Sequence, residues 1–201
     1  MKIRTLNAVL LTVLLAAAPA HGAATNELTV AAAPGIPFRF LALSDPHFRN
    51  MEKLPQGLAG YRTFLAEVKS LKPDFAVILG DICGEDPPAL AQAKKISDES
   101  GVKVHYIHGN HDDTGKFREA FGEASYSFDH KGWHFINFDS VSGASGWLKA
   151  DLEKVPAETP VVFMQHYMPT GNGRLREMLE KHRSALALSG DVHGHRHGMV
   201  G

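Results

Sequence analysis

Carboxylate, imidazole and amide side chains follow five apolar runs of this 201-residue sequence, at the point where each run ends. In order, they are Asp45 and His47, Asp81, Asn110 with His111 and Asp112, His166, and Asp191 with His193. Oxygen and nitrogen ligands without thiolate suit Mn, Fe or Zn. In open α/β sheets, ligands bind just beyond the carboxyl ends of the strands. We therefore expect these side chains to converge on one metal site.

Each of these residues also has an ordinary structural interpretation. An Asp that follows a strand, such as Asp45 or Asp81, is usually a turn or helix-capping residue. Asn110 after a glycine is usually a turn residue, and His166 could be a hydrogen-bonded core histidine. These interpretations treat the positions as independent, whereas the same ending recurs after five runs, and this repetition favours the metal site. Histidines without the pattern are interpreted as structural: His21, His105, His108, His130, His134 and His182.

The apolar runs alternate with segments of helical periodicity, which predicts an α/β layered domain. Buried strands are expected at 38–43, 75–79, 102–107, 161–164 and 185–188, with a hairpin over 125–129 and 133–139. Helices are expected at 57–71, 88–100, 145–155 and 173–183. This arrangement would place the candidate metal ligands, from Asp45 to His193, at strand ends.

The first residues have the features of an export signal. Residues 1–22 begin with Lys2 and Arg4, continue with an apolar run and end in small residues, which predicts a secretory signal peptide. The run is shorter than the ~20 residues that span a bilayer, so we expect no membrane anchor after cleavage. We interpret residues 23–35 as a linker and 36–201 as the domain, secreted or periplasmic. The single cysteine, Cys83, excludes an internal disulfide.

The ordered motifs resemble those of the calcineurin-like metallophosphoesterases. The resemblance runs from Asp45 to His197, and five motifs in order make it specific. It implies a four-layer α/β/β/α sandwich with a two-metal site at one edge of the paired sheets.

Carried over residue by residue, the resemblance implies two divalent ions, Mn, Fe or Zn, beside a proton donor. The ligands of the first ion would be Asp45, His47, Asp81 and a histidine of the last motif. Those of the second would be the bridging Asp81, Asn110, His166 and another residue of the last motif. His111 would contact the substrate and protonate the leaving oxygen, and Asp112 would orient His111.

The last motif departs from the Gly-His-x-His pattern of that family. In one register Asp191 replaces the first histidine and His193 is the second; in the other, His195 and His197 are the ligands. We favour the first, because the ligand should start where the strand ends, and Asp is itself a competent ligand. His195 could also substitute in space for the missing imidazole. Only three residues follow the motif, which predicts a shortened second sheet or a fragment.

We therefore expect an exported hydrolase of a small phosphomonoester or phosphodiester, cyclic nucleotides included, with attack by a hydroxide held on two metal ions. Two cations roughly 3.5–4 Å apart can hold the attacking and leaving oxygens together. With 21 basic and 22 acidic residues, no basic excess indicates a nucleic-acid polymer as partner. Two alternatives stay open: a catalytically reduced relative that binds metal or phosphate, and a metal-dependent hydrolase of another ester or amide.

Overall fold

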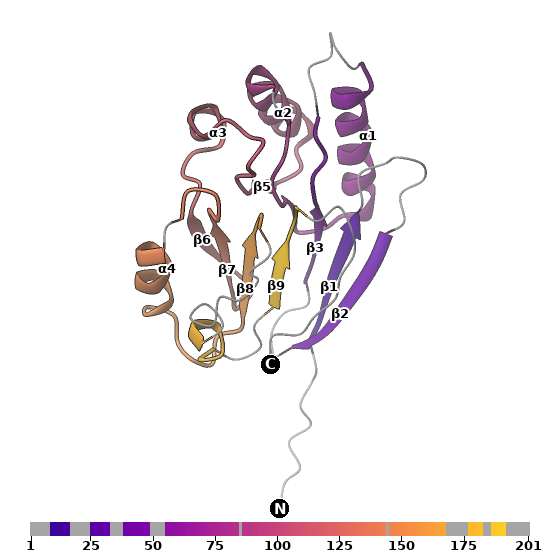
Figure 1. Ribbon diagram of the computed structural model, residues 1–201. Helices are drawn as coiled ribbons and strands as arrows, with labels where there is room; N and C mark the ends of the chain where they lie inside the picture. The colour runs from indigo at the N-terminus through magenta and orange to yellow at the C-terminus, as the bar shows by residue number, and fades with distance from the viewer. Residues whose placement is uncertain are drawn as a thin grey trace, which may run out of the picture.

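Two β-sheets form the centre of the computed structural model, which describes residues 9–16, 25–32, 38–48, 55–84, 86–143, 145–167, 177–182 and 186–191. Within these residues the strands form one sheet of five and one of four. Figure 1 shows the two sheets side by side, with helices along their outer sides.

The first sheet has the strand order β2-β1-β3-β4-β5. Its strands are β1 (Val9–Ala16), β2 (Thr25–Ala32), β3 (Phe38–Leu43), β4 (Phe75–Ile78) and β5 (Val104–Tyr106). Strands β1, β3, β4 and β5 run parallel, and β2 is antiparallel to β1. The carboxyl ends of β3, β4 and β5 therefore lie along one edge.

The second sheet has the order β6-β7-β8-β9. Its strands are β6 (Tyr126–His130), β7 (Trp133–Phe138), β8 (Val161–Gln165) and β9 (Leu186–Ser189). Strands β6 and β7 form the predicted hairpin, whereas β7, β8 and β9 run parallel. The second sheet thus has its own row of carboxyl ends, at β7, β8 and β9.

The two sheets pack face to face through an aromatic core. Phe40 and Phe75 of the first sheet and Phe135 of the second are fully or almost fully buried in this cluster. The rings of Phe75 and Phe135 meet edge to face across the interface, with centroids 5.2 Å apart. Aromatic pairs in this geometry add to the stability gained from area burial alone.

Helices cover the outer face of each sheet. The first sheet carries α1 (Pro55–Leu71), α2 (Pro87–Ser100) and α3 (Thr114–Phe121), whose buried side chains form one cluster with Leu43 and Ile78. The second sheet carries α4 (Ser145–Leu152), whose Leu148 and Leu152 pack on Ile136 and Phe163. The layers are therefore helix, sheet, sheet and helix, and the predicted four-layer α/β/β/α sandwich is confirmed.

The structure adds three elements to those expected from the sequence. Helix α3 begins at an N-cap, because the Asp113 carboxylate accepts a hydrogen bond from the N–H of Lys116. Strand β1 falls inside the predicted signal peptide, 1–22, whose cleavage stays a prediction. Strand β2 falls inside 23–35 and pairs with β1 throughout, and the division of the chain into linker and domain stays a prediction.

Three further expectations concern the helix at 173–183, a membrane span and the length of the second sheet. Residues 177–179 are helical, inside the helix expected at 173–183, and the remainder of that range is described only from 180 to 182. Among the described residues, no helix has both the length and the apolar character needed to span a membrane. The second sheet has four strands there, and its shortening relative to the family stays a prediction.

Candidate metal centre

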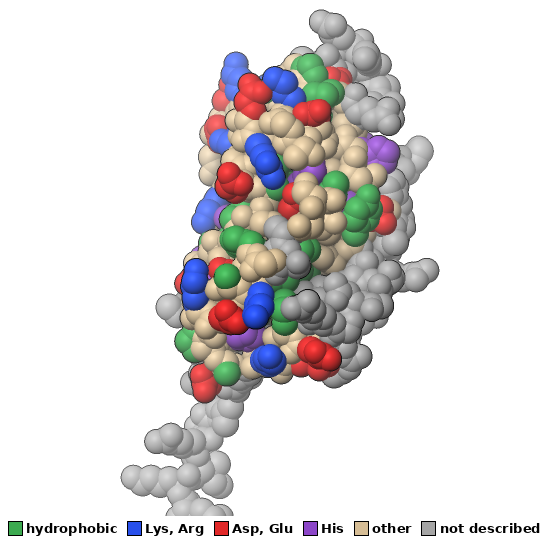
Figure 2. All heavy atoms as spheres, turned by 60° about the vertical axis from the view of Figure 1, so that its left-hand side comes forward, with side chains coloured by type: hydrophobic (Ala, Val, Ile, Leu, Met, Phe, Trp, Pro, Cys, Tyr) green, Lys and Arg blue, Asp and Glu red, His purple; other side chains and the backbone are tan. Residues whose placement is uncertain are grey.

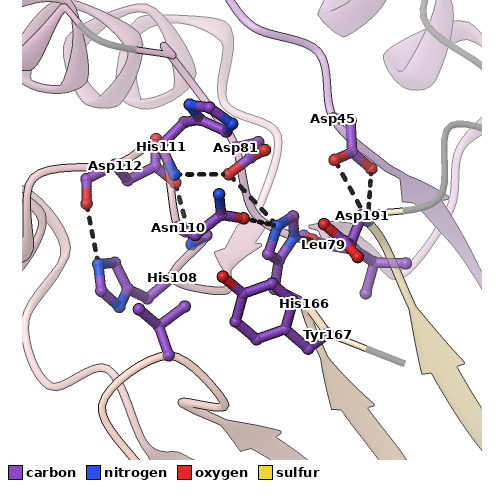
Figure 3. A network of polar contacts seen from close by, with 12 residues as sticks. Asp45, Leu79, Asp81, His108, Asn110, His111, Asp112, His166, Tyr167 and Asp191 are labelled. Carbon is purple, nitrogen blue, oxygen red and sulfur yellow. Dashed lines mark hydrogen bonds and ion pairs between the residues drawn. The ribbon is translucent and has the colours of Figure 1, made fainter. Parts of the chain in front are cut away.

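Three buried side chains from both sheets meet at the carboxyl ends of the strands. Asp45 follows β3, Asp81 follows β4, and His166 follows β8. One ligand atom from each lies within 4.8 Å of the others, and all three residues are buried. Figure 3 shows them facing one another across the two sheet edges. Residues distant in the sequence are thus brought together as the strand-end pattern predicts.

The hydrogen bonds of His166 determine which of its ring nitrogens is free to bind a metal. Its Nδ1 lies 2.8 Å from the carbonyl oxygen of Leu79, which can only accept, so Nδ1 carries the proton. In a neutral ring Nε2 then points a lone pair toward Asn110 Oδ1 at 2.8 Å and Asp81 Oδ1 at 3.3 Å. Three acceptor atoms that converge without a proton between them are stabilised by a cation, so this donor set fits a metal ion.

His47 lies on the other side of Asp81. Its Nε2 is 3.6 Å from Asp81 Oδ2, and its side chain is partly exposed. The backbone holds it there, because the N–H of His47 donates to the carbonyl of Asp81 and the N–H of Phe48 donates to that of Ile82. Asp81 therefore has one carboxylate oxygen facing His166 and the other facing His47, as a bridging ligand requires.

Asp191 contributes its backbone to the site. Its N–H lies 3.0–3.2 Å from both carboxylate oxygens of Asp45 and donates to that group. The Asp191 residue is exposed, and its carboxylate is not part of the group formed by Asp45, Asp81 and His166. The other proposed ligands of the last motif, His193 and His195, lie outside the described residues, as does His197. The choice between the two registers therefore stays a prediction.

Asn110 and His111 form the exposed side of the site. Both residues are exposed, in contrast to the buried group beneath them. The N–H of His111 donates to Asp81 Oδ1 over 3.0 Å, which fixes the loop directly on the central carboxylate. The His111 ring lies with its centroid 5.5 Å from that of His47. A histidine at this place can reach a group that binds from solvent.

Asp112 holds the loop backbone that carries His111. Its carboxylate accepts hydrogen bonds from the N–H groups of Ile82, Cys83 and Gly109. These bonds fix the backbone on both sides of the loop, and the expected role of Asp112 in orienting His111 stays a prediction. Burial raises the pKa of the Asp112 carboxyl to about 6, and the nearby charge of Asp81 adds to this, although the three N–H donors act in the opposite direction.

A buried ion pair ties this loop to the second sheet. Nδ1 of His108 lies 3.0 Å from Asp139, and Nε2 lies 3.0 Å from the carbonyl oxygen of Asp112. Burial alone would lower the pKa of His108, but these two acceptors outweigh it and raise the pKa. Burial likewise opposes ionisation of Asp139, yet His108 and the Ser142 N–H lower its pKa to about 2. Both ring nitrogens of His108 therefore face acceptor oxygens, which favours the charged imidazolium beside the Asp139 carboxylate.

Neither partner of this pair was among the predicted site residues. His108 was interpreted as structural, and Asp139 received no role. The position of Asp139 could have identified it, because Asp139, like the other candidate ligands, directly follows a buried strand, here β7.

Glycine lets the loops of the site approach one another. A Cβ at Gly109 would overlap the backbone nitrogen of Asp81, and a Cβ at Gly80 would overlap the His166 ring. A Cβ at Gly190 would lie 2.5 Å from the carbonyl oxygen of Leu79. These contacts are closer than any side chain tolerates, so glycine is required at the ends of β4, β5 and β9 alike.

Backbone strain concentrates at the same place. Asp45, His47 and Asp81 adopt φ values of 51°, 45° and 52°, in the left-handed region that non-glycine residues rarely occupy. Such conformations persist where the surrounding structure fixes them, and they cluster at functional sites. Here they turn each side chain sharply at a strand end and toward the common centre.

Comparison with known proteins agrees with this geometry. The family model for calcineurin-like phosphoesterase matches residues 38–197, which span every described residue of the site. The chain belongs to this family. As a calcineurin-like phosphoesterase it is a metal-dependent hydrolase of phosphoric esters, and the resemblance stated from the motifs is confirmed. No curated protein matches the chain.

Proposed function

We propose that this calcineurin-like phosphoesterase hydrolyses a small phosphomonoester or phosphodiester, cyclic nucleotides included, at a centre of two divalent metal ions. The observation that carries the proposal is the convergence of ligand atoms from Asp81, Asn110 and His166 beside the exposed His111. One carboxylate oxygen of Asp45 completes the buried group, within 4.8 Å of a ligand atom of Asp81 and of His166. A phosphate that approaches from solvent would therefore meet the metal site and a proton donor together.

The residues divide into two ligand sets that share Asp81. Asp45, His47 and Asp81 would hold one ion, and Asp81, Asn110 and His166 the other, with the last motif completing both. Bound Mn, Fe or Zn would lower the pKa of water and neutralise the phosphate oxygens. The bridging role is supported by the two carboxylate oxygens of Asp81, which face opposite imidazoles.

The remaining residues supply and position a proton. His111 would donate a proton to the leaving oxygen, because histidine is the side chain that most often serves as a general acid. Its exposure gives it access to the ester. Asp112 and His108 fix the backbone that carries it. General acid catalysis of this kind contributes roughly 10²- to 10⁴-fold to the rate.

Turnover by the purified chain tests the proposal. The activity of the full chain would be measured with Mn²⁺ on p-nitrophenyl phosphate and on its bis-ester, with the metal content measured in parallel. We expect hydrolysis of at least one ester, loss of metal and activity in Asp81→Ala, and a fall of about 10²-fold or more in His111→Ala with the metal retained. Arg62→Ala, in an exposed ion pair on α1, is the matched control and should keep full activity.

Two results would separate the alternatives. Tight metal binding without turnover of either ester across several metals would support the catalytically reduced relative instead. Hydrolysis of carboxylic esters or amides, but not of phosphate esters, would support the non-phosphate hydrolase.

We further propose that the protein acts outside the cytoplasm on a small-molecule partner. The export proposal rests on residues 1–22, and the mass of the mature protein in a fractionated culture tests it. A small-molecule partner is supported by the composition, with 21 basic and 22 acidic residues, and by the face in Figure 2, on which acidic and basic side chains are interspersed rather than gathered by sign. A nucleic-acid-binding face would instead carry a continuous basic patch.

A further inference from the structure

Tyr167 is the large hydrophobic residue that the described part of the structure leaves exposed, at 37%. It follows His166 immediately, where the chain leaves β8. A single exposed aromatic residue is ordinary on a protein surface. Its place is what makes Tyr167 informative, because the residue before it is a member of the buried ligand group.

The ring of Tyr167 is held against the site. Its backbone N–H donates to Ser140 Oγ over 3.0 Å, which anchors the residue to the loop that follows β7. The ring packs against the imidazole of His166, with centroids 5.4 Å apart and planes inclined by 45°. Tyr167 is therefore positioned on two sides, while more than a third of its surface stays open to solvent.

Among the described residues, those exposed beside the ligand group include Asn110, His111, Asp191 and Tyr167. Asn110 and His111 are polar and belong to the loop after β5, whereas Tyr167 is aromatic and belongs to the second sheet. Figure 3 shows the Tyr167 ring beside His166, on the side of the site where Asn110 lies. An ester whose phosphoryl group reaches the buried ligands would leave its alcohol portion on the solvent side, and the Tyr167 ring, packed on the imidazole of the ligand residue His166, is an exposed aromatic surface next to the ligand group.

We propose that Tyr167 is a specificity residue that stacks on a planar aromatic group in the alcohol portion of the substrate. The inference rests on the proposed function and adds the substrate class: aryl or nucleoside phosphates over aliphatic ones. Stacking of a base on an aromatic side chain is independent of base identity, since every base has a π-face. The phenol hydroxyl is dispensable for this role, because the ring face makes the contact.

Substitution of Tyr167 tests the inference. The kcat/KM of the wild type, Tyr167→Ala and Tyr167→Phe would be compared on p-nitrophenyl phosphate, adenosine monophosphate and glycerol phosphate. We expect Tyr167→Ala to lose about 5- to 100-fold on the two aromatic esters, mainly through KM, and less than about 2-fold on glycerol phosphate. Tyr167→Phe should retain the wild-type preference. Each variant is compared with the wild type on the same ester, so differences in leaving-group reactivity cancel.

The arms of the experiment distinguish the sources of an aromatic group. A loss confined to p-nitrophenyl phosphate indicates an aryl ester, and a loss confined to adenosine monophosphate indicates a nucleoside; either supports stacking. An equal loss on all three esters would assign Tyr167 a purely structural role and overturn the inference, as would no loss on either aromatic ester.

Binding measurements keep the inference separate from the proposed function. Calorimetry with phenylphosphonate and methylphosphonate, neither of which is a hydrolysable ester, needs no turnover. We expect the wild type to prefer phenylphosphonate and Tyr167→Ala to lose that preference. If the wild type hydrolyses no ester but shows this preference, the proposed function fails and the stacking role stands. If esters are hydrolysed and no such preference exists, the reverse holds.

Discussion

The buried pair of His108 and Asp139 gives the sharpest test of how the site is supported. Both side chains are almost inaccessible, at 1% and 3% exposure, and their atoms lie 3.0 Å apart. The substitution Asp139→Asn removes the charge but keeps a side-chain oxygen. That oxygen can still accept the hydrogen bonds that the N–H groups of Val141 and Ser142 donate to Asp139 in the native protein. The change therefore isolates the ion pair from the turn it also stabilises.

The expected cost follows from burial. Removal of one partner from a buried ion pair costs about 3–5 kcal/mol, because the other charge is left without compensation. The lower end, about 3 kcal/mol, applies to Asp139→Asn, since the turn is preserved. For a chain of this size each kcal/mol lowers Tm by about 2–4 °C, so we expect a fall of about 6–12 °C. Activity should fall too, because His108 also holds the carbonyl of Asp112 in the loop that carries His111.

The chain offers a control of the same chemistry in which the carboxylate is exposed. Asp129 pairs with Nδ1 of His134 at 2.7 Å, but the Asp129 side chain is 80% exposed, and the buried His134 keeps Asp151 as a second partner at 3.0 Å. Exposed pairs contribute less than about 1 kcal/mol, so Asp129→Asn should barely change Tm or activity. Urea unfolding at pH 7 and thermal melts of both variants measure the difference. Equal losses in the two variants would refute the argument that burial determines the value of the pair.

Three further outcomes are expected. Burial, with a smaller effect from Lys103, lowers the pKa of His105 to about 4 from an ordinary 6.5, so the unfolded chain takes up a proton that the folded chain refuses as pH falls through this window. The wild type should therefore lose about 3 kcal/mol of unfolding free energy between pH 6.5 and 4, at 1.36 kcal/mol per pKa unit, and His105→Phe should not show this loss. Urea unfolding of both proteins at the two pH values measures the difference, and an equal loss of unfolding free energy in both would contradict the argument. Gly109→Ala should abolish activity and lower Tm, because its Cβ overlaps the backbone of Asp81. Gly122→Ala should keep activity, because a Cβ there meets nothing within 4 Å, although it should lose about 1–3 kcal/mol of stability because its φ of 90° and ψ of −152° suit only glycine. Chelation should lower Tm and activity together, and Mn²⁺ should restore both; a chelated protein with unchanged Tm would count against a metal held at this site.

Most of the fold could be predicted from the apolar runs of the sequence. Strand β3 was predicted at its observed bounds, and helix α1 within two residues at its start, because both present long apolar patterns. Helix α3 was missed because its eight residues bury only Phe117, which is too little periodicity to detect. Strand β1 was interpreted only as a leader, since an apolar run of that length satisfies a signal peptide and a buried strand equally.

The site was predictable where its residues follow strands and unpredictable where they act through distant partners. Asp45, Asp81 and His166 were found from position alone, and the structure brings them together. Asp139 also follows a strand, but the sequence does not show that it pairs with His108, 31 positions away. Tyr167 was missed for a different reason, because exposure of one aromatic side chain is decided by how the loops around it fold.

The ligand group also has a mechanical consequence. Asp45 and Asp81 are carried by the first sheet and His166 by the second, so an ion held among them would cross-link the two halves of the sandwich at their open rim. The aromatic core secures the interior of the interface, while the rim would depend on that ion. The stability of this edge of the sheet interface would then depend on metal binding. Without bound metal, the protein should be cleaved by a protease more readily at this edge than elsewhere.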